Sequence, residues 1–357
     1  MHILVVTDAW YPQVNGVVRT YEWLAQEIPK FGAEVSYLVP SQFRTVPCPT
    51  YPEIRLALAT PGMVERYIDS VGPDFIHIAT EGPLGLLARR YCRKHKRPFT
   101  TSYHTRFPEY VSARLPVPES WCYAFQRRFH NSGAGLFVAA PSVEHDLSAK
   151  GFERIMRWTR GVDVELFRPQ SVRLFGEDTV FLYIGRVSVE KNIEAFLKLD
   201  LPGSKVVVGG GPQLAELARA YPEVHFTGPK KGEELAQAYA SGDVFVFPSL
   251  TDTFGLVLLE ALACGVPVAA YPVHGPKDVI TDPAAGVLDS DLRTAALKAM
   301  ELSREDARNH ALNFSWENSA KQFLDNVLTA HNLGLPERRR LLTRLNPKRL
   351  IRRKTAA

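Results

Sequence analysis

Short apolar segments alternate with helical patterns along most of the chain. In the first 160 residues, apolar runs typical of buried strands occur at 3–6, 35–39, 75–79 and 136–139. Helical periodicity lies between them at about 17–30, 82–95, 119–132 and 142–150. After residue 176 the alternation restarts, with strands expected at 179–184, 205–208, 224–226, 244–247 and 266–270. This alternation predicts parallel sheets that are covered by helices on both faces.

The pattern lapses between the two halves, and we expect a hinge near 161–176. The predicted fold class is α/β, with two doubly wound, Rossmann-like domains facing a cleft, over residues 1–160 and 171–314. An amphipathic helix at 315–330 is expected to pack back on the first domain, ahead of a basic tail at 336–357. Doubly wound sheets bind ligands where the carboxyl ends of their strands open into a crevice, so the cleft is the expected site.

Composition narrows the class of protein. The 357 residues are 45 % hydrophobic and 23 % charged, as in a globular protein of two domains. Four scattered cysteines without a CxxC pair argue against a disulfide framework or a zinc site and favour a reducing cytoplasm. No apolar run approaches the roughly 18 to 20 residues of a membrane-spanning helix, and the start MHILVV predicts a strand, not a signal peptide.

The segment SLTDTFGLVLLEALACG, residues 249–265, carries two acids in a setting that needs explaining. Asp252 lies in a loop after an apolar strand, while Glu260 lies inside an otherwise apolar helix, where a carboxylate needs a partner. The helix is expected to begin near Gly255, with the backbone N–H groups of Phe254, Gly255 and Leu256 at its positive end. Asp252, beside Thr253, can accept hydrogen bonds from sugar hydroxyls, and Glu260 can reach a vicinal diol such as a ribose. The alternative is a capping Asp and a Glu satisfied by the backbone.

Cations and glycines are expected at the same crevice. Arg186 follows a strand and Lys191 is expected to start the next helix, an arrangement that suits a pyrophosphate, although both could be solvated surface cations. Three glycines centred on Gly210 would let a ligand approach the backbone. In the first domain Asn15 and Gly16 precede a helix, where N–H groups can bind an anion, but an Asn-Gly turn can also be purely structural. The absence of GxGxxG argues against a dinucleotide.

The stretch FTTSYHTRFPEYV, residues 99–111, places polar side chains at the cleft from the first domain. A strand ends there and delivers His104 and Arg106 to a loop, and a structural role for the histidine is the alternative. Tyr103, the neighbour of His104, and Glu81, in the stretch IHIATEGPLG (76–85), are further candidates for contacts with an acceptor or a sugar.

Taken together, PxxNG (12–16), GR…EKN (185–192), GGGP (209–212) and DTFG…LLEALACG (252–265) resemble the motifs of retaining GT-B glycosyltransferases of family 4. The resemblance covers nearly all of residues 1–330 in the same order. It implies that Arg186 and Lys191 hold the diphosphate of a nucleotide sugar and that Glu260 holds the ribose. The loop of Asn15 and Gly16 would close on the transferred sugar, and His104 would touch sugar and diphosphate. The family commonly has Glu where this chain has Asp252.

One branch of the family is favoured. YHTRFPEY, TDTFG and IHIATEGPLG are similar to lipid-directed enzymes: diacylglycerol α-mannosyl-, sulfoquinovosyl- and glucosyl/glucuronosyltransferases. The resemblance implies front-face transfer in which the leaving phosphate takes the proton of the acceptor hydroxyl. With Arg186 and Lys191 present, no metal and no cofactor are expected; the nucleotide sugar is a substrate. UDP-glucose or UDP-glucuronate is the first expectation for the donor and GDP-mannose the second.

The positive net charge of the chain is concentrated in its C-terminal tail. From Glu337 onward it holds nine Lys or Arg against one Glu, so residues 1–336 carry about −3 of a total of +5. Basic residues interleaved with leucines suit an anionic membrane surface. The predicted membrane contacts are Trp121, Arg127, Arg128, Arg338, Arg339, Arg340, Arg344, Arg349, Arg352 and Arg353. A disordered solubilising tail is the alternative, and the acidic body argues against nucleic acid.

Three functions follow as hypotheses. The favoured one is a glycosyltransferase on the inner face of the cell membrane that acts on a lipid such as diacylglycerol; no protein partner is expected. The second is a soluble GT-B enzyme, such as a glycosyltransferase with another acceptor or a sugar-nucleotide epimerase. The third is a non-catalytic module that binds a nucleotide sugar. The presence of all four charged residues of the predicted site, Arg186, Lys191, Asp252 and Glu260, argues against it.

Overall fold

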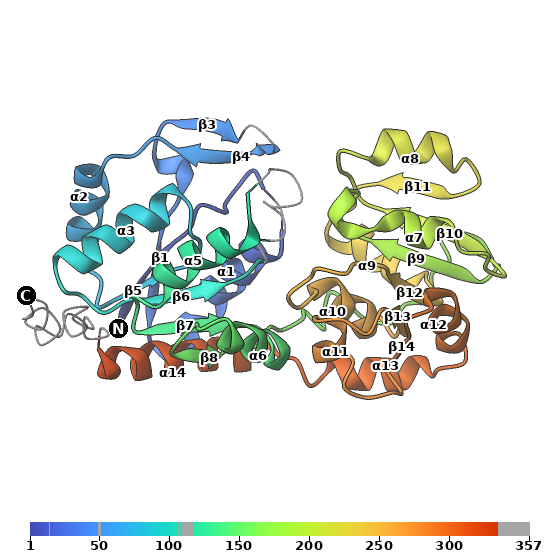
Figure 1. Ribbon diagram of the computed structural model, residues 1–357. Coiled ribbons are helices and arrows are strands. Elements are labelled where there is room, and N and C mark those ends of the chain that lie inside the picture. Colours follow the sequence, from blue (N-terminus) through green and yellow to red (C-terminus); the bar gives the residue numbers. More distant parts are fainter. Residues whose placement is uncertain (14, 49–50, 106–107, 109–116, 335–357) are drawn as a thin grey trace, which may run out of the picture.

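Two parallel β-sheets, each with helices packed against it, form two domains that lie side by side in the computed structural model of the protein (Figure 1). The structure describes residues 1–334 except 14, 49–50, 106–107 and 109–116. Arg106 and the predicted basic tail therefore lie outside the described residues.

The N-terminal sheet has the strand order β2-β1-β5-β6-β7-β8, with all neighbours parallel. Its strands are β1 (His2–Val6), β2 (Glu34–Leu38), β5 (Phe75–Ile78), β6 (Thr100–Tyr103), β7 (Gly135–Val138) and β8 (Ile155–Arg157). Its helices are α1 (Gly16–Glu27), η1 (Ile28–Phe31), η2 (Pro40–Gln42), α2 (Pro61–Val71), α3 (Pro83–Lys94), α5 (Glu119–His130) and α6 (Pro141–Ala149). An antiparallel hairpin, β3 (Thr45–Cys48) and β4 (Tyr51–Ala57), stands apart from the sheet.

The C-terminal sheet has the order β11-β10-β9-β12-β13-β14, again all parallel. Its strands are β9 (Val180–Ile184), β10 (Ser204–Val208), β11 (His225–Gly228), β12 (Val244–Phe247), β13 (Val268–Ala270) and β14 (Gly286–Leu288). Its helices are η3 (Val189–Lys191), α7 (Ile193–Leu197), α8 (Leu214–Ala220), α9 (Gly232–Ala240), α10 (Leu256–Ala263), α11 (Pro276–Val279), α12 (Leu292–Ala299) and α13 (Arg304–Ala311). The strand order reverses between β9 and β12, which is where such sheets open a ligand crevice.

The predicted α/β fold with two doubly wound domains is confirmed, and the strands follow the apolar runs. Every residue of β9 and β12 is buried, as expected for strands covered on both faces. The sequence pattern did not predict the β3–β4 hairpin, helix α2 or the three-residue edge strands β8 and β14. Lys191 does not start a helix: it ends the 3-10 turn η3, Asn192 follows with φ +52°, and α7 begins at Ile193.

The chain crosses between the domains twice, at two adjacent places. The first crossing follows β8, and the second leads into helix α14 (Trp316–Leu333), which packs beneath the N-terminal sheet (Figure 1). The N–H of Val162 donates to the carbonyl of Phe314 at 3.2 Å, so the crossings run side by side. The indole N–H of Trp158 reaches the carbonyl and hydroxyl oxygens of Ser319, both at 3.1 Å, and thereby ties α14 to the N-terminal core.

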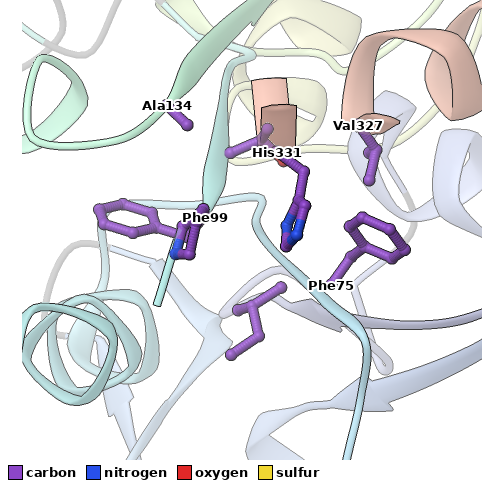
Figure 2. A pocket seen from close by; sticks show the side chains of 8 residues that line it. Phe75, Phe99, Ala134, Val327 and His331 are labelled. Carbon is purple, nitrogen blue, oxygen red and sulfur yellow. The ribbon is translucent and has the colours of Figure 1, made fainter. Parts of the chain in front are cut away.

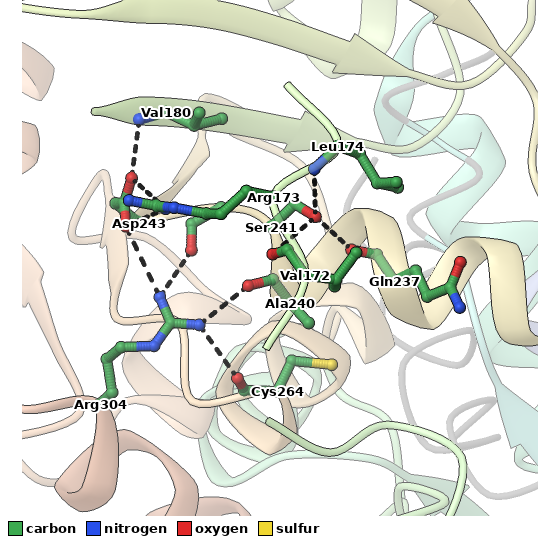
Figure 3. Close-up of polar contacts among 11 residues, drawn as sticks. Val172, Arg173, Leu174, Val180, Gln237, Ala240, Ser241, Asp243, Cys264 and Arg304 are labelled. Atoms are coloured by element: carbon green, nitrogen blue, oxygen red, sulfur yellow. Dashed lines mark hydrogen bonds and ion pairs between the residues drawn. The ribbon is translucent and has the colours of Figure 1, made fainter. Parts of the chain in front are cut away.

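Past the first crossing, the linker is anchored on the C-terminal domain (Figure 3). Arg173 donates to both oxygens of Asp243, at 2.8 and 3.0 Å, and the N–H of Val180 donates to the same carboxylate at 2.9 Å. Ser241 accepts from the N–H of Leu174 at 3.1 Å. Residues 173–174 are therefore fixed on the C-terminal domain, and Arg308 fixes the linker earlier still by donating to the carbonyls of Val164 and Phe167.

Candidate active site

The crevice of the C-terminal domain opens between β9 and β12. Arg186 follows β9 and Asp252 lies in the loop after β12, and these two strands are hydrogen-bonded neighbours. The predicted cation and acid therefore come from the two sides of the point where the strand order reverses. Such a point is the usual place for a ligand in a doubly wound sheet.

Lys191 and Asp252 form an ion pair in this crevice. The ammonium Nζ lies 2.6 Å from Asp252 Oδ1, and the two side chains are 21 % and 18 % exposed. The other carboxylate oxygen, Oδ2, is buried and has no hydrogen-bond partner among the described residues. One oxygen of Asp252 is thus held by a cation, while the second remains able to accept a hydrogen bond.

Two glycine positions shape the walls of the crevice. Gly255 has φ +88° and is the N-cap of α10, so the N–H groups of the first turn of this helix begin at the crevice. A Cβ on Gly209 would lie only 1.9 Å from the carbonyl oxygen of Gly185, so the turn before Gly210 packs directly on the end of β9. The turns at Gly209 and Gly255 both require glycine, and they place backbone atoms along the crevice that Arg186 borders.

The buried carboxylate of α10 has the partner that the sequence required, and it comes from the other domain. Glu260 is 6 % exposed; its Oε1 accepts from Arg19 of α1 at 2.5 Å, and its Oε2 accepts from the hydroxyl of Tyr239 at 2.8 Å. Burial, and next the charge of Glu260, raises the pKa of Tyr239 well above its usual value, so this phenol stays a hydrogen-bond donor. The alternative of a Glu satisfied by the backbone is wrong.

The start of α1 faces the start of α10 across the cleft. Asn15 caps α1 by accepting from the N–H groups of Val17 and Val18, at 3.0 and 3.1 Å. A Cβ on Gly16 would lie 3.5 Å from the side chain of Leu256, so the loop predicted to cover the sugar comes within van der Waals reach of the first residue of α10. Both predicted donor loops are thereby brought together.

His104 lies where the two domains touch. Its carbonyl oxygen accepts from the hydroxyl of Thr253 at 2.8 Å, its Nε2 contacts the hydroxyl of Tyr21 at 2.9 Å, and its Nδ1 lies 3.4 Å from Arg160 Nη2. Arg160 can only donate, so Nδ1 accepts and Nε2 carries the proton. Burial, and next the charge of Arg160, lowers the pKa of His104 well below 6.5, so the ring is neutral. Both ring nitrogens are engaged by Tyr21 and Arg160, so a contact of this ring with a diphosphate would require one of these partners to be displaced.

The other N-terminal candidates differ in accessibility. Glu81 is partly exposed, and its Oε1 accepts from Gln126 at 3.1 Å and contacts His130 Nε2 at 2.9 Å. Tyr103 is 1 % exposed within the apolar core and packs edge-on against His130 and Phe152. Tyr103 is the last residue of β6 and is buried among these rings, and its contact with an acceptor or a sugar stays a prediction.

Helix α5 links the cleft to the surface. Its inner face contributes Gln126 and His130 to Glu81, while on its outer face Trp121 is 71 % exposed and Phe125 47 % exposed. Arg127 and Arg128 are exposed next to them. The predicted membrane residues of α5, Trp121, Arg127 and Arg128, are therefore exposed, and together with Phe125 we call them the aromatic and basic patch of α5.

The sequence analysis did not predict Arg19, Tyr21, Arg160 or Tyr239, which hold the site residues Glu260 and His104. The buried Glu260 required a partner, but spacing alone could not choose Arg19 among 43 Lys and Arg residues. Tyr21 and Arg160, which hold His104, occur in an amphipathic helix and a hinge, where nothing in the sequence marks them. Long-range contacts of this kind become visible only in the fold.

A cavity of about 180 Å³ lies between the domains beside Glu260. It is lined by α1, the hinge, α9, α10 and the first residue of α14: Arg19, Glu22, Trp23, Gly161, Val162, Asp163, Leu166, Phe167, Gly232, Leu235, Leu256, Glu260 and Trp316. The pocket in Figure 2 is different: it lies at the amino ends of the N-terminal strands, is lined mainly by apolar groups such as Phe75, Phe99 and Val327, and encloses about 10 Å³. That space is too small for a substrate.

Neither a metal cluster nor a membrane span occurs in the described part of the chain. No group of three or more His, Cys, Asp or Glu side chains is arranged to hold a metal ion there. None of the described helices combines the length and the apolar character that crossing a bilayer requires.

Comparisons with known proteins point to one family. The family described as "Glycosyltransferase Family 4" matches residues 14–166, and "Glycosyl transferases group 1" matches residues 178–303. A GDP-mannose-dependent alpha-mannosyltransferase of Mycobacterium tuberculosis is 30 % identical over 81 % of this chain and 83 % of its own. The sulfoquinovosyl transferase SQD2 of Arabidopsis thaliana is 33 % identical over 79 % of this chain and 62 % of its own length. An alpha-monoglucosyldiacylglycerol synthase of Streptococcus pneumoniae is 27 % identical over 90 % and 83 %.

Solved structures share the fold. Sucrose-phosphate synthase from Thermosynechococcus elongatus superimposes with a TM-score of 0.74 at 20 % identity, over 91 % of this chain and 97 % of its own. Anabaena HepE in complex with UDP-glucose gives a TM-score of 0.69 at 15 % identity, over 92 % and 100 %. Together with the two family matches and the relatives at 30 % identity or more, these similarities show that the chain is a GT-B protein and belongs to glycosyltransferase family 4.

Proposed function

We propose that the protein is a retaining glycosyltransferase that moves a hexose or hexuronic acid from a nucleotide sugar to a membrane lipid, with diacylglycerol as the first candidate acceptor. The product would be an α-glycolipid. The observation that carries the donor class is the crevice between β9 and β12, in which Arg186, the Lys191–Asp252 pair and the start of α10 meet.

The diphosphate of the donor binds next to Arg186, Lys191 and the N-terminal end of α10 in this proposal. Two unit charges about 4 Å apart attract by roughly 4 kcal/mol near a protein surface, so two cations can hold an anion firmly. Lys191 is already fixed by Asp252 at 2.6 Å, so it needs no large movement to share its protons with a phosphate oxygen. The first N–H groups of α10 add hydrogen-bond donors.

The two acids then bind hydroxyl groups. Asp252 Oδ2, which is buried without a hydrogen-bond partner among the described residues, accepts from a hydroxyl of the transferred sugar. Glu260 accepts from the vicinal hydroxyls of the ribose. A buried acceptor that is satisfied only when the right hydroxyl arrives discriminates strongly against sugars that lack it.

Transfer occurs on the face from which the diphosphate leaves. The acceptor oxygen forms a bond to the anomeric carbon, the bond from that carbon to the phosphate oxygen breaks, and the acceptor proton passes to the leaving phosphate. Arg186, Lys191 and the end of α10 stabilise the charge that develops on the diphosphate, which is the main electrostatic contribution to catalysis. With these groups at the leaving group, we expect activity without an added metal ion.

Helix α5 supports the choice of a lipid acceptor. Its aromatic and basic patch suits an anionic lipid surface, while its inner side chains hold Glu81 at the cleft. One relative is named a sulfoquinovosyl transferase and another an alpha-monoglucosyldiacylglycerol synthase, and the second name supports a lipid product. We therefore place the protein on the inner face of the cell membrane, held by α5 and by the basic tail.

A second candidate donor is GDP-mannose. Three relatives are named GDP-mannose-dependent alpha-mannosyltransferases. UDP-glucose and UDP-glucuronate stay the first expectation from the sequence, with Arg106 as the proposed contact to an anionic sugar.

Two variants test the donor site directly. Lys191→Met and Asp252→Asn should each lower kcat/KM for transfer at least 100-fold, because each removes a group that binds the donor. Lys198→Met is the matched control: Lys198 forms an ion pair with Glu194 at the same 2.6 Å distance, but both side chains are exposed on α7 and its end. Wild-type rates in Lys191→Met or Asp252→Asn would contradict the proposed donor site.

A further inference from the structure

Among the described residues, three residue pairs make polar contacts across the cleft. Arg19 meets Glu260, Thr253 donates to the carbonyl of His104, and Asp278 accepts from the N–H of Ser142 at 3.0 Å. Of these three pairs, Arg19 and Glu260 are the one that joins a cationic side chain to a carboxylate. It also involves the carboxylate that the proposed function assigns to the ribose.

The carboxylate of Glu260 is oriented but not saturated. Arg19 occupies one position on Oε1 at 2.5 Å, and Tyr239 occupies one on Oε2 at 2.8 Å. An ionised carboxylate offers about four acceptor positions, so about two remain for the hydroxyls of a diol. Arg19 therefore does not have to leave when a ribose binds.

Arg19 also changes the charge that a donor meets. Glu260 lies on the same helix whose N-terminal end faces the diphosphate, so an uncompensated carboxylate there would repel the donor. Lys191 is already paired with Asp252 within the C-terminal domain, whereas the cation for Glu260 comes from α1 of the N-terminal domain. The ribose position is thus neutralised only when the domains are close.

Space for a ligand group exists beside this pair. Arg19 and Glu260 both line the cavity of about 180 Å³, together with Trp23 of α1 and Leu235 of α9. The cavity is bounded by both domains, so a group placed next to Glu260 would touch α1 as well as α10.

Resting on the proposed function, we propose that Arg19 is a donor-positioning residue: it fixes and neutralises Glu260 from across the cleft, so that the ribose-binding carboxylate is complete only when the domains close. Arg19 acts through Glu260 in this assignment and does not touch the reacting atoms. Its loss weakens donor binding more than it slows the chemical step.

The test uses the full chain and the nucleotide sugar that the wild type binds best among UDP-glucose, UDP-glucuronate and GDP-mannose. We expect Arg19→Gln to raise the donor KM and Kd about tenfold while kcat falls less than threefold, with partial recovery in Arg19→Lys. In a Glu260→Gln background, Arg19→Gln should have no further effect on Kd. Arg157→Gln is the matched control, because Arg157 pairs with Glu144 at 2.5 Å on the surface of one domain.

Each other outcome overturns the role. An unchanged Kd in Arg19→Gln, with wild-type binding intact, or tighter binding in that variant would show that Arg19 does not support the donor site. An equal loss in Asp278→Asn, which weakens the other interdomain carboxylate contact, would assign the effect to domain closure alone. Failure of the wild type to bind any nucleotide sugar would instead contradict the proposed function itself.

Discussion

His77 lies at the end of the buried chain of hydrogen bonds that supports His104, and it provides a thermodynamic test of that network. It is fully buried; its Nε2 contacts the hydroxyl of Tyr21 at 2.9 Å, and its Nδ1 contacts Thr100 Oγ1 at 2.8 Å. Burial, and next the charge of Arg160, lowers the pKa of His77 from 6.5 to about 3. The imidazole is therefore neutral in the folded protein at neutral and mildly acidic pH.

The sign of the effect follows from proton counting. Below about pH 6.5 the unfolded chain protonates this histidine while the folded protein does not, so the free energy of unfolding falls as the pH falls. The slope is about 1.4 kcal/mol per pH unit for one such group, or roughly 2.7 kcal/mol between pH 6.5 and 4.5. This contribution is fully present above pH 6.5 and is lost progressively down to the folded pKa.

Chemical denaturation at a series of pH values measures this dependence. The variant His77→Gln is expected to be less stable at pH 7.5, because it changes a buried hydrogen-bonding group, yet its stability should depend less on pH by about 1.4 kcal/mol per unit. The assignment of a neutral, buried His77 would be refuted if the free energy of unfolding had the same pH dependence in the variant and the wild type. Titration of His77 near pH 6.5 in the folded protein, seen by NMR, would refute it as well.

Three further predictions address other parts of the molecule. Gly255→Ala should lower stability by about 1–2 kcal/mol and weaken donor binding, measured by denaturation and calorimetry, since φ is +88° there and the added Cβ would lie 3.1 Å from Leu258. Trp121→Ser with Phe125→Ser should weaken binding to anionic liposomes more than tenfold in a flotation assay while donor hydrolysis persists, because each ring contributes on the order of 2 kcal/mol when buried. Asp243→Ala should cost about 1–2 kcal/mol of stability, seen by denaturation, since it frees Arg173 and the N–H of Val180. Wild-type values in any of these would contradict the corresponding reasoning.

The sequence was most informative where local patterns carry the signal. Apolar runs located the buried strands β9 and β12, and the acids after and beyond β12 pointed to a crevice between them. Turn chemistry located Gly255 as the start of α10. These features depend on neighbours in the chain, so periodicity and spacing reveal them.

Features that depend on distant neighbours were out of reach. The partner of Glu260 is separated from it by 241 residues, and the groups that contact the ring of His104 come from α1 and from the start of the hinge. The three-residue strands β8 and β14 are too short for an apolar period to identify them.

The central claim is transfer of a sugar from a nucleotide to a lipid, and a donor panel tests it most directly. UDP-glucose, UDP-glucuronate, UDP-galactose and GDP-mannose would each be incubated with the protein and with anionic liposomes that contain diacylglycerol, and the lipids would be analysed by mass spectrometry. A glycosylated diacylglycerol from one donor, absent with Asp252→Asn, is the predicted result. Release of nucleotide from a donor with no glycosylated lipid would contradict the lipid acceptor, and no turnover of any donor would contradict the proposed transfer.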